Sequence, residues 1–433
     1  MPTSTNEMSD REEIDRVRLN EGDLSPALAD AAHHPIPTDA PGIRDRPYML
    51  ITPVWGDSFT RSFVSITLPS QLAEGNLGAF AKDEVEYVIV TTAQDEETIR
   101  SSESFRKLQD VAAATFIRHQ PIDDETNYER LTRTMNLALR RIEGEKSVFF
   151  LTADDFFSDG LLGYARERLV QGSRAVIVPT LRVNQAGFNA HLWSLRASTL
   201  KPRALVRAIM QHEHPLLMSV VINCASQTMH ELPSQTLVRL KDGYLGRWNV
   251  MHPLAVKVAP PVPDISSTVD WNYPALVSRN AGDIEIIRDS DHGLVASPTQ
   301  LGYSQDYSID HGATPRARTR NLIEWVNSGW PLNFHTLQAS DFVRIHADEI
   351  GPEWRDAEAE LDEICGPYLD YVRKRALVFP DSLRGSNGEL LSPAVRSGEI
   401  SVRLRRALRI GFKRGRARLK GLIRGALRRL RVG

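Results

Sequence analysis

The chain has 433 residues, of which 41% are hydrophobic and 25% are charged, and its formal net charge is −2. These values are typical of a globular protein with one extensive core or two smaller ones. Two cysteines, Cys224 and Cys365, exclude a disulfide framework, and we expect both to be free thiols in a reducing compartment. No secretory signal is expected from the polar N-terminus, and no run approaches the ~18 apolar residues of a membrane-spanning helix.

The net charge is divided unevenly along the chain. Residues 401–433 carry thirteen Lys or Arg and no Asp or Glu, which leaves 40 basic against 55 acidic residues in the rest. An acidic body with a basic tail indicates two regions with different partners. Residues 1–45 lack a periodic apolar pattern and are punctuated by proline, so we expect them to be disordered. Residues 380–400 have the composition of a linker.

Five apolar runs predict strands between Pro47 and Pro179. They are PYMLITPV, VEYVIVT (85–91), ATFIRH (114–119), SVFFLT (147–152) and RAVIVP (174–179). Helical spacing separates them, in FTRSFVSITLPSQLA, in one helix over about 95–110, in the series Tyr128, Leu131, Met135, Leu139 and Ile142, and in Leu161–Val170. Continuous apolar strands that alternate with helices predict an α/β fold, with a mostly parallel central sheet covered by helices on both faces.

The second half of the chain is less regular. We expect a helix over about 204–212, a strand PLLMSVVIN (215–223) and a short strand IEII followed by Asp289-Ser290-Asp291. NLIEWVNSG and EWRDAEAELDEICGPYLDYVRKRAL have helical patterns. This half is therefore predicted to be an irregular α+β region with a helical extension.

Two adjacent carboxylates, Asp154 and Asp155, follow the fourth predicted strand in FFLTADDFFSDG. A carboxylate pair after a buried strand suits a hard divalent cation that also bridges phosphates. The alternative is helix capping by Asp155 or Ser158, because both residue types favour that position. The stretches TPVWGD, TTAQD and TADD all end predicted strands, so we expect them at one edge of the sheet, where parallel sheets bind ligands.

The order of these elements resembles the nucleotide-sugar glycosyltransferases of GT-A fold, in particular the family-2-like group. Four weak motifs within about residues 47–180 carry the resemblance: the turn Thr52-Pro53-Val54-Trp55-Gly56-Asp57, the stretch VIVTTAQDEET, the helix TMNLALRRIEGEK with Asn136, and the strand end FLTADD. It implies that residues 46–180 bind the nucleotide-sugar and that residues 181–379 form the acceptor side. This sequence departs from the family at Thr91 or Thr92, where the family has a uracil-contacting Asp, and at Thr152, where it has a further Asp.

The resemblance also implies roles for single residues. The turn from Thr52 to Asp57, with Thr91, Thr92, Asn136 and Asp154, would bind the nucleotide-sugar. Asp154 and Asp155 would hold Mn²⁺ or Mg²⁺. A late histidine often completes such a site, and His252 and His214 are the candidates. The alternatives are satisfied structural histidines or, for His212 and His214 in QHEHP, a zinc site.

Further acidic residues are candidates for metal binding and proton transfer. Asp289 and Asp291 could add metal or acceptor contacts, or form a polar turn after a strand. An inverting transfer needs a base for the acceptor hydroxyl, and Asp270, beside Trp271, is the first choice and Glu213 the second. A loop aspartate bonded to its own backbone is the other explanation of Asp270.

The basic tail 401–433 has an apolar stripe at helical spacing with cations on its other faces. It predicts an amphipathic helix on an anionic membrane surface, through Arg405, Leu408, Phe412, Arg416, Leu419, Ile423, Arg424 and Leu430. Nucleic acid is the rival partner, disfavoured because Phe412 is the only aromatic residue there.

The sequence thus predicts a metal-dependent glycosyltransferase at the cytoplasmic face of a membrane, acting on a lipid-linked or surface-glycan acceptor. A nucleotidyltransferase would normally carry a Gly-rich basic loop after its first strand, which TPVWGDSFTR lacks. A non-catalytic membrane adaptor is the remaining alternative.

Overall fold

The computed structural model describes residues 46–224, 235–266, 268–278, 281–303, 319–320, 322–323 and 338–378. The expectations for residues 1–45, the linker 380–400 and the tail residues from Arg405 to Leu430 lie outside these ranges.

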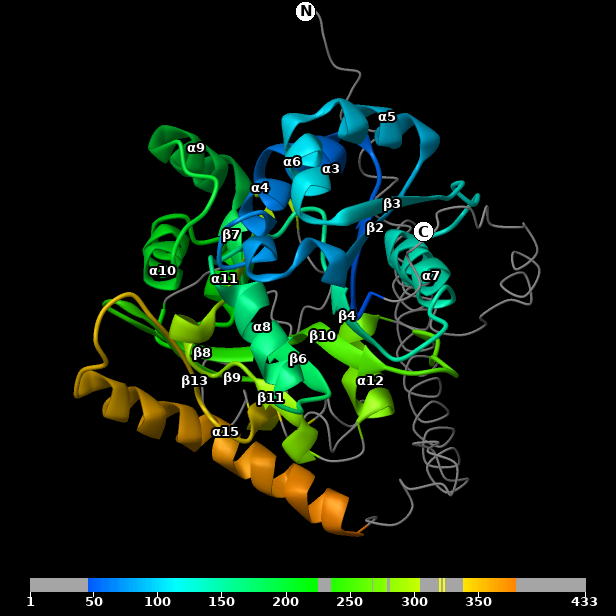
Figure 1. Cartoon of the computed structure of the whole chain (residues 1–433). Helices are drawn as coiled ribbons and strands as arrows, with labels where there is room; N and C mark the ends of the chain where they lie inside the picture. The colour runs from blue at the N-terminus through cyan, green and yellow to red at the C-terminus, as the bar shows by residue number, and fades with distance from the viewer. Residues whose placement is uncertain are drawn as a thin grey trace, which may run out of the picture.

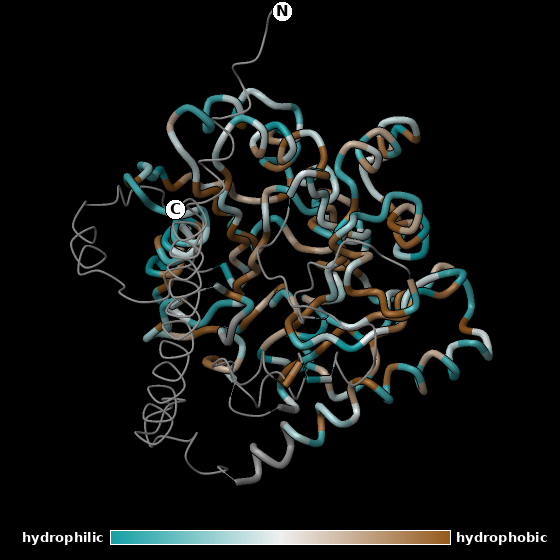
Figure 2. Tube along the Cα trace, turned by 180° about the vertical axis from the view of Figure 1, so that it is seen from behind, coloured by the Kyte–Doolittle hydropathy of each residue, from teal (hydrophilic) through white to brown (hydrophobic). Residues whose placement is uncertain are grey.

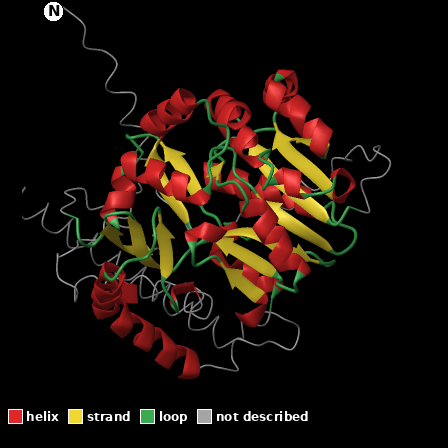
Figure 3. Ribbon diagram, turned by 60° about the vertical axis from the view of Figure 1, so that its left-hand side comes forward, coloured by secondary structure: helices red, strands yellow, loops and turns green. Residues whose placement is uncertain are grey.

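A sheet forms the centre of the protein (Figures 1 and 3). It has seven strands in the order β11-β6-β10-β4-β1-β2-β3. Its strands are β1 Tyr48–Val54, β2 Val85–Thr91, β3 Ala113–Arg118, β4 Lys146–Phe150, β6 Ala175–Val178, β10 His252–Val258 and β11 Ile284–Ile286. Only β10 runs antiparallel to its neighbours, β4 and β6. The predicted α/β fold with a mostly parallel sheet is confirmed.

Both faces of this sheet are covered by helices, because successive strand residues point to opposite sides. Tyr48 and Leu50 pack on one face, while Met49 and Ile51 pack on the other. The first face is covered by η2 Phe63–Thr67, α4 Leu68–Gln71, α5 Ala93–Ser101, α6 Glu103–Val111 and α8 Leu161–Val170. The second is covered by α7 Asn127–Leu139 and α12 Val269–Val277. Apolar residues accordingly concentrate in the interior (Figure 2).

The helix predicted over 95–110 is in fact two. The backbone of Ser102 is extended, and its hydroxyl accepts the amide of Phe105 at 3.1 Å to cap α6. Serine favours the N-cap over the helix interior because its hydroxyl accepts a backbone amide that would otherwise have no partner.

The predicted strand 215–223 is wrong, because Pro215–Ser219 forms the short helix α11. Pro215 occupies the first turn, where proline is tolerated, and the His214 ring caps the helix by accepting the amide of Leu216 at 3.1 Å. Of this run, only Val221 forms a bridge to the strand residue Leu237.

Two further three-stranded sheets are β5-β12-β7, which joins strands from both halves of the chain, and β13-β9-β8, which is formed by the second half alone. Their strands are β5 Phe156–Phe157, β7 Thr180–Asn184, β8 Gln235–Leu240, β9 Gly243–Trp248, β12 Val295–Thr299 and β13 Val343–His346. The remaining long helices in the described parts of the chain are α9 Gln185–Leu195, α10 Pro202–Gln211 and α15 Glu353–Val378. The remaining short helical segments there are α3 Asp57–Ser62, η3 Leu77–Ala79, η4 Lys82–Glu84, η5 Ala281–Asp283 and η6 Ser290–His292.

The predicted C-terminal helix is confirmed as α15, which lies along β8 and β9 (Figure 1). Leu361 and Trp354 of α15 pack against Val238 and Leu245 in a small separate core. Among the described helices, none has the length and apolarity that crossing a membrane would require.

Candidate functional site

The carboxyl ends of β1 and β4 form the switch point of the central sheet. β2 and β3 lie on one side of β1, whereas β4 lies on the other and pairs with it in parallel, Ile51 opposite Phe150. Sheets of this kind bind ligands just beyond the carboxyl ends of the strands at such a point. Trp55 follows β1 here, and Asp154 and Asp155 follow β4. The predicted common edge is therefore present.

Polar side chains form hydrogen bonds to the backbone of the turn that carries Asp154 and Asp155. The Thr67 hydroxyl donates to the carbonyl of Ala153 at 2.9 Å, and the amide of Phe157 donates to the Ser70 hydroxyl at 3.2 Å. The Asn76 amide group donates to the carbonyl of Ser158 at 3.1 Å. Because these contacts fix the backbone on both sides of the pair, the carboxylates are placed by a rigid support.

The capping explanation of these residues is wrong. α8 begins after Gly160, whose φ of 99° places it in the left-handed region, and the first-turn amide of Leu162 donates to Oδ1 of Asn76 at 3.0 Å. The Ser158 hydroxyl instead accepts the amide of Leu294 at 3.0 Å. Asp155 therefore contributes nothing to the start of α8.

The pair itself is a concentration of negative charge with little exposure. Asp155 is 7% exposed and Asp154 is half-buried. Burial, and then the charge of Asp155, raise the pKa of Asp154 to about 7, against the opposing effect of Arg182. No Lys or Arg of the described ranges forms an ion pair with either carboxylate, and the buried hydroxyl of Thr152 has no hydrogen-bond partner there. Oxygen ligands in this state fit a divalent cation.

Arg182 is a residue of this site that the sequence analysis missed. It lies on β7 between the buried Leu181 and Val183, and its Nη1 donates to the Thr299 hydroxyl at 3.1 Å. Its guanidinium stands 5.3 Å from the centre of the Tyr303 ring. The alternation in TLRVN was the available signal, because it turns Arg182 away from the core.

Asp270 lies in the first turn of α12 and shares an electrostatic neighbour, Tyr128, with Arg182. Tyr128, at the start of α7, has Tyr303, Arg182 and Asp270 as its electrostatic neighbours. Tyr128 and Tyr303 are 46% and 41% exposed, respectively. Arg182 is thus an electrostatic neighbour of both Asp154 and Tyr128.

The turn after β1 is tied to the turn after β2 through Asp95. The amide of Gly56 and the hydroxyls of Thr60 and Thr92 donate to its carboxylate at 3.0, 3.0 and 2.7 Å. Gly56 has a φ of 83°, which favours glycine. Asp95 was not singled out from the sequence, yet it fixes the spacing between the two loops.

His119, directly after β3, is a second missed residue. It is 4% exposed and both ring nitrogens are buried; burial is the largest cause that lowers its pKa, and a backbone hydrogen bond with Gln120 opposes it. Its ring packs edge-on against Trp55 at 5.8 Å, and the guanidinium of Arg130 lies 5.8 Å from the Trp55 ring centre. Thr91 ends the neighbouring strand β2, and its buried hydroxyl has no hydrogen-bond partner among the described residues.

Several residues implied by the resemblance have structural partners instead. The side-chain amide of Asn136 donates to the carbonyl of Ile265 at 2.9 Å and accepts its amide at 2.8 Å, so it clamps the segment before α12. Thr52 is buried, with its hydroxyl 2.8 Å from that of Tyr87. Pro53 and Val54 are buried within β1. Asp57 is exposed and pairs with Arg61 of the next turn.

The other candidate base and the histidines are likewise engaged. Glu213 pairs with Arg239 at 2.6 Å and accepts the Tyr244 hydroxyl. The Nε2 of His214 lies 2.9 Å from the carbonyl of Gln300, and that of His252 lies 2.8 Å from the carbonyl of Phe150. Because a carboxylate held by a guanidinium is a poor acceptor of a substrate proton, Asp270 is the better candidate base.

Asp289 and Asp291 belong to a different place in the fold. They precede β12, whose Val295 pairs with Phe157 in an antiparallel ladder with β5. Asp155 comes just before β5, and the antiparallel pairing puts it toward the C-terminal end of β12, whereas Asp289 and Asp291 lie before the N-terminal end of β12. The expectation that Asp289 and Asp291 complete the Asp154 site is therefore not supported by the register.

No protein-family model and no curated protein matches the chain. Among solved structures, it is similar to a mannosyltransferase from Pyrobaculum calidifontis in complex with GDP-Man and Mn²⁺, at 12% identity over 87% of this chain and 86% of that one, with a TM-score of 0.27. TarS of S. aureus shows 14% identity over 77% of this chain and 54% of its own, with a TM-score of 0.27. A 4-diphosphocytidyl-2C-methyl-D-erythritol synthase from Anaerococcus prevotii shows 12% identity over 37% and 59%, with a TM-score of 0.22.

The chain spans less than two thirds of the length of the last two proteins. At these identities and TM-scores the similarities carry no argument about activity. What the site does must follow from its own residues.

Proposed function

We propose that the protein is a metal-dependent glycosyltransferase that moves a sugar from a nucleotide-diphosphate donor to a hydroxyl acceptor. The observation that carries the proposal is the pair Asp154 and Asp155, two buried or half-buried carboxylates at the β1/β4 switch point without a described cationic partner. They would hold Mn²⁺ or Mg²⁺. Such a cation, when bound, neutralises the negative charge of a leaving diphosphate.

The residues around the pair suit the other parts of such a donor. Arg182 presents a guanidinium beside Asp154, and guanidinium groups bind phosphate oxygens in a fixed geometry. Trp55, half-buried after β1, offers an aromatic face, and the buried ring of His119 supports it edge-on. A planar nucleoside base can stack on such a face.

Asp270 is the proposed base for the acceptor. Its carboxylate would accept the proton of the attacking hydroxyl while the hydroxyl oxygen forms the new bond to the sugar. Tyr128 is an electrostatic neighbour of both Asp270 and Tyr303, and the two half-exposed tyrosine rings are surfaces on which a sugar can stack. The acceptor is therefore proposed to bind between α7, α12 and the segment after β12.

The direct test is a donor screen on the full chain. UDP-, GDP-, CMP- and dTDP-sugars, each with Mn²⁺ or Mg²⁺, are assayed by thermal shift and by release of the free nucleotide. We expect the nucleotide-sugars of one base to raise the melting temperature of the protein and to be hydrolysed slowly, and both effects to require the cation. Release of pyrophosphate from a nucleoside triphosphate would indicate a nucleotidyltransferase instead. No stabilisation by any nucleotide would sink the proposal and favour a non-catalytic adaptor.

The acceptor is proposed to be lipid-linked or a growing surface glycan at the cytoplasmic face of a membrane. The support is the sequence of residues 401–433, whose apolar stripe and thirteen cations suit anionic head groups at about 1 kcal/mol per basic residue. A chain truncated after residue 400 is expected to lose flotation with anionic vesicles while keeping donor hydrolysis. Unchanged flotation would contradict a membrane role of the tail.

A further inference from the structure

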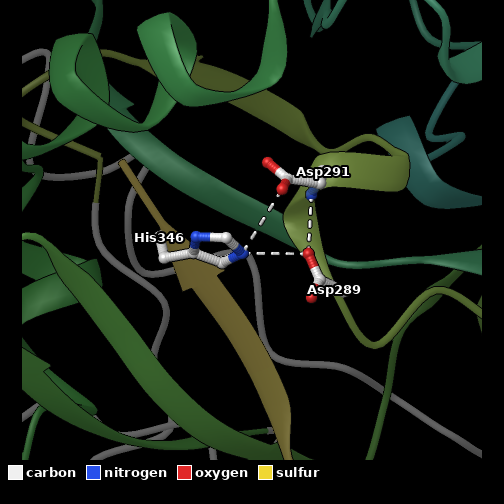
Figure 4. Close-up of side chains that lie close together, drawn as sticks. All are labelled: Asp289, Asp291 and His346. Carbon is white, nitrogen blue, oxygen red and sulfur yellow. Dashed lines mark hydrogen bonds and ion pairs between the residues drawn. The ribbon is translucent and has the colours of Figure 1, made fainter. Parts of the chain in front are cut away.

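A second group of metal-ligand side chains lies outside the proposed catalytic site. Asp289 precedes the turn η6, Asp291 lies within it, and His346 ends β13 (Figure 4). One ligand atom from each residue lies within 4.8 Å of the other two. The Nε2 of His346 is 3.0 Å from Oδ1 of Asp289 and 3.9 Å from Oδ2 of Asp291. More than fifty residues separate the histidine from the aspartates, which is why the sequence analysis did not join them.

The orientation of the His346 ring is fixed from its other side. The ring is 3% exposed, and its Nδ1 lies 2.7 Å from the carbonyl of Asp348. A carbonyl only accepts, so Nδ1 carries a proton, and Nε2 points at the two carboxylates. Metal-binding histidines are usually held in this way, with one nitrogen bonded to a carbonyl and the other free to bind the ion. The space before Nε2 suits either a second proton or a cation.

The spacing and the support of the carboxylates suit a cation. Neighbouring ligands of an ion at about 2.1 Å stand roughly 3.0 Å apart in an octahedron and roughly 3.4 Å apart in a tetrahedron. The 3.0 Å between His346 and Asp289 matches the first value, and the 3.9 Å between His346 and Asp291 is wider than either. Arg203 of α10 holds Asp291 from the outer side with two contacts, at 2.9 and 2.8 Å. Asp289 accepts the amide of Asp291 at 2.8 Å. Ligand carboxylates in metal sites are commonly oriented by such outer partners.

We propose that Asp289, Asp291 and His346 bind a divalent transition-metal ion, at a site separate from Asp154 and Asp155. One imidazole and two carboxylates suit Zn²⁺ or Mn²⁺ better than Mg²⁺ or Ca²⁺, which prefer oxygen alone. The proposal does not depend on the glycosyltransferase assignment.

The position of the group gives the ion a structural role. η6 connects β11 of the central sheet with β12, while β13 belongs to the sheet β13-β9-β8. Hydrogen bonds already join β13 to the segment from β11 to η6. The amide of Arg344 donates to the carbonyl of Arg288 at 2.7 Å, and the amide of His346 donates to the Ser290 hydroxyl at 3.0 Å. An ion at this place would cross-link the two sheets and stabilise the folded protein.

The test uses the full chain with Asp154→Asn and Asp155→Asn, so that the proposed catalytic cation is absent. After treatment with a chelator, this variant is titrated with Co²⁺ and Zn²⁺. One equivalent of Co²⁺ is expected to bind with visible absorption, and Zn²⁺ is expected to raise the melting temperature. Adding His346→Gln should weaken binding by at least about tenfold and abolish the thermal shift. The matched control is His292→Gln, because His292 lies in the same turn but stacks on Tyr164 at 4.7 Å.

A second measurement keeps the proposal testable if His346→Gln does not fold. In the variant that retains His346, the ring resonances of this histidine should shift on addition of Zn²⁺ and return with chelator. Ring resonances of a doubly protonated imidazole that ignore Zn²⁺ would overturn the proposal and leave an ion-pair network in its place. Equal Co²⁺ affinity with and without His346 would overturn it as well. Failure of every donor in the nucleotide-sugar screen would leave these outcomes unaffected.

Discussion

Asp154→Asn and Asp155→Asn should each reduce cation-dependent turnover of the nucleotide donor by about 10²- to 10³-fold, the range found when one charge-stabilising group is removed from an active site. An amide is a neutral and weaker ligand, so the cation is held less tightly and the leaving diphosphate is less well neutralised. Turnover with Mn²⁺ and Mg²⁺, measured at several cation concentrations, separates lost affinity from lost catalysis.

The same substitutions should stabilise the metal-free protein. Two like charges sit together at this turn with little exposure, so replacing one by a neutral group removes repulsion. We expect a melting temperature several degrees higher for Asp154→Asn at pH 8 without cation, and a smaller gain in excess Mn²⁺. Glu103→Gln is the control, because Glu103 lies in the first turn of α6 outside the proposed site, is exposed and pairs with Lys107. It should leave turnover unchanged within about twofold; full activity in Asp154→Asn and Asp155→Asn would contradict the assigned metal site.

Cation affinity should fall steeply as the pH drops below about 7. Burial, and then the charge of Asp155, raise the pKa of Asp154 to about 7, and the cation needs the ionised carboxylate. Affinity is therefore expected to approach a fall of about tenfold per pH unit below that value, or about 50-fold between pH 7 and pH 5. Calorimetry in buffers of different ionisation enthalpy should show close to one proton released per cation at pH 6 and almost none at pH 8.5.

The sign of the stability effect follows from the same shift. The folded-state pKa of Asp154 lies above its ordinary value of 3.8, so between about pH 4 and pH 7 the folded protein binds this proton more tightly than the unfolded chain. The metal-free protein should thus lose stability as the pH rises through this window, and Asp154→Asn should remove that loss. An affinity that stays constant from pH 5 to pH 7 would show that Asp154 is not the titrating ligand.

The sequence could locate Asp154 and Asp155 because local pattern and strand direction were enough. A buried run that ends in two carboxylates places them at the carboxyl edge of a parallel sheet, whatever the rest of the chain does. The same local pattern could not show whether Asn136 meets a ligand or the backbone. Its partner, Ile265, is far away in the sequence, and only the packing of the segment before α12 onto α7 brings them together.

By itself, the sequence determined the α/β class, six of the seven strands of the central sheet and the helix α15, since apolar periodicity is a local property that tertiary contacts here reinforce. It also determined the basic character of residues 401–433. The antiparallel strand β10 was not predicted. Only the tertiary structure decided that Arg182 acts electrostatically on Asp154, that His119 is buried against Trp55, and that Asp289 and Asp291 meet His346 rather than Asp154 and Asp155. These contacts join distant segments, and the register of β5 with β12 and the crossing of β13 past η6 set them. No single window of sequence contains that register.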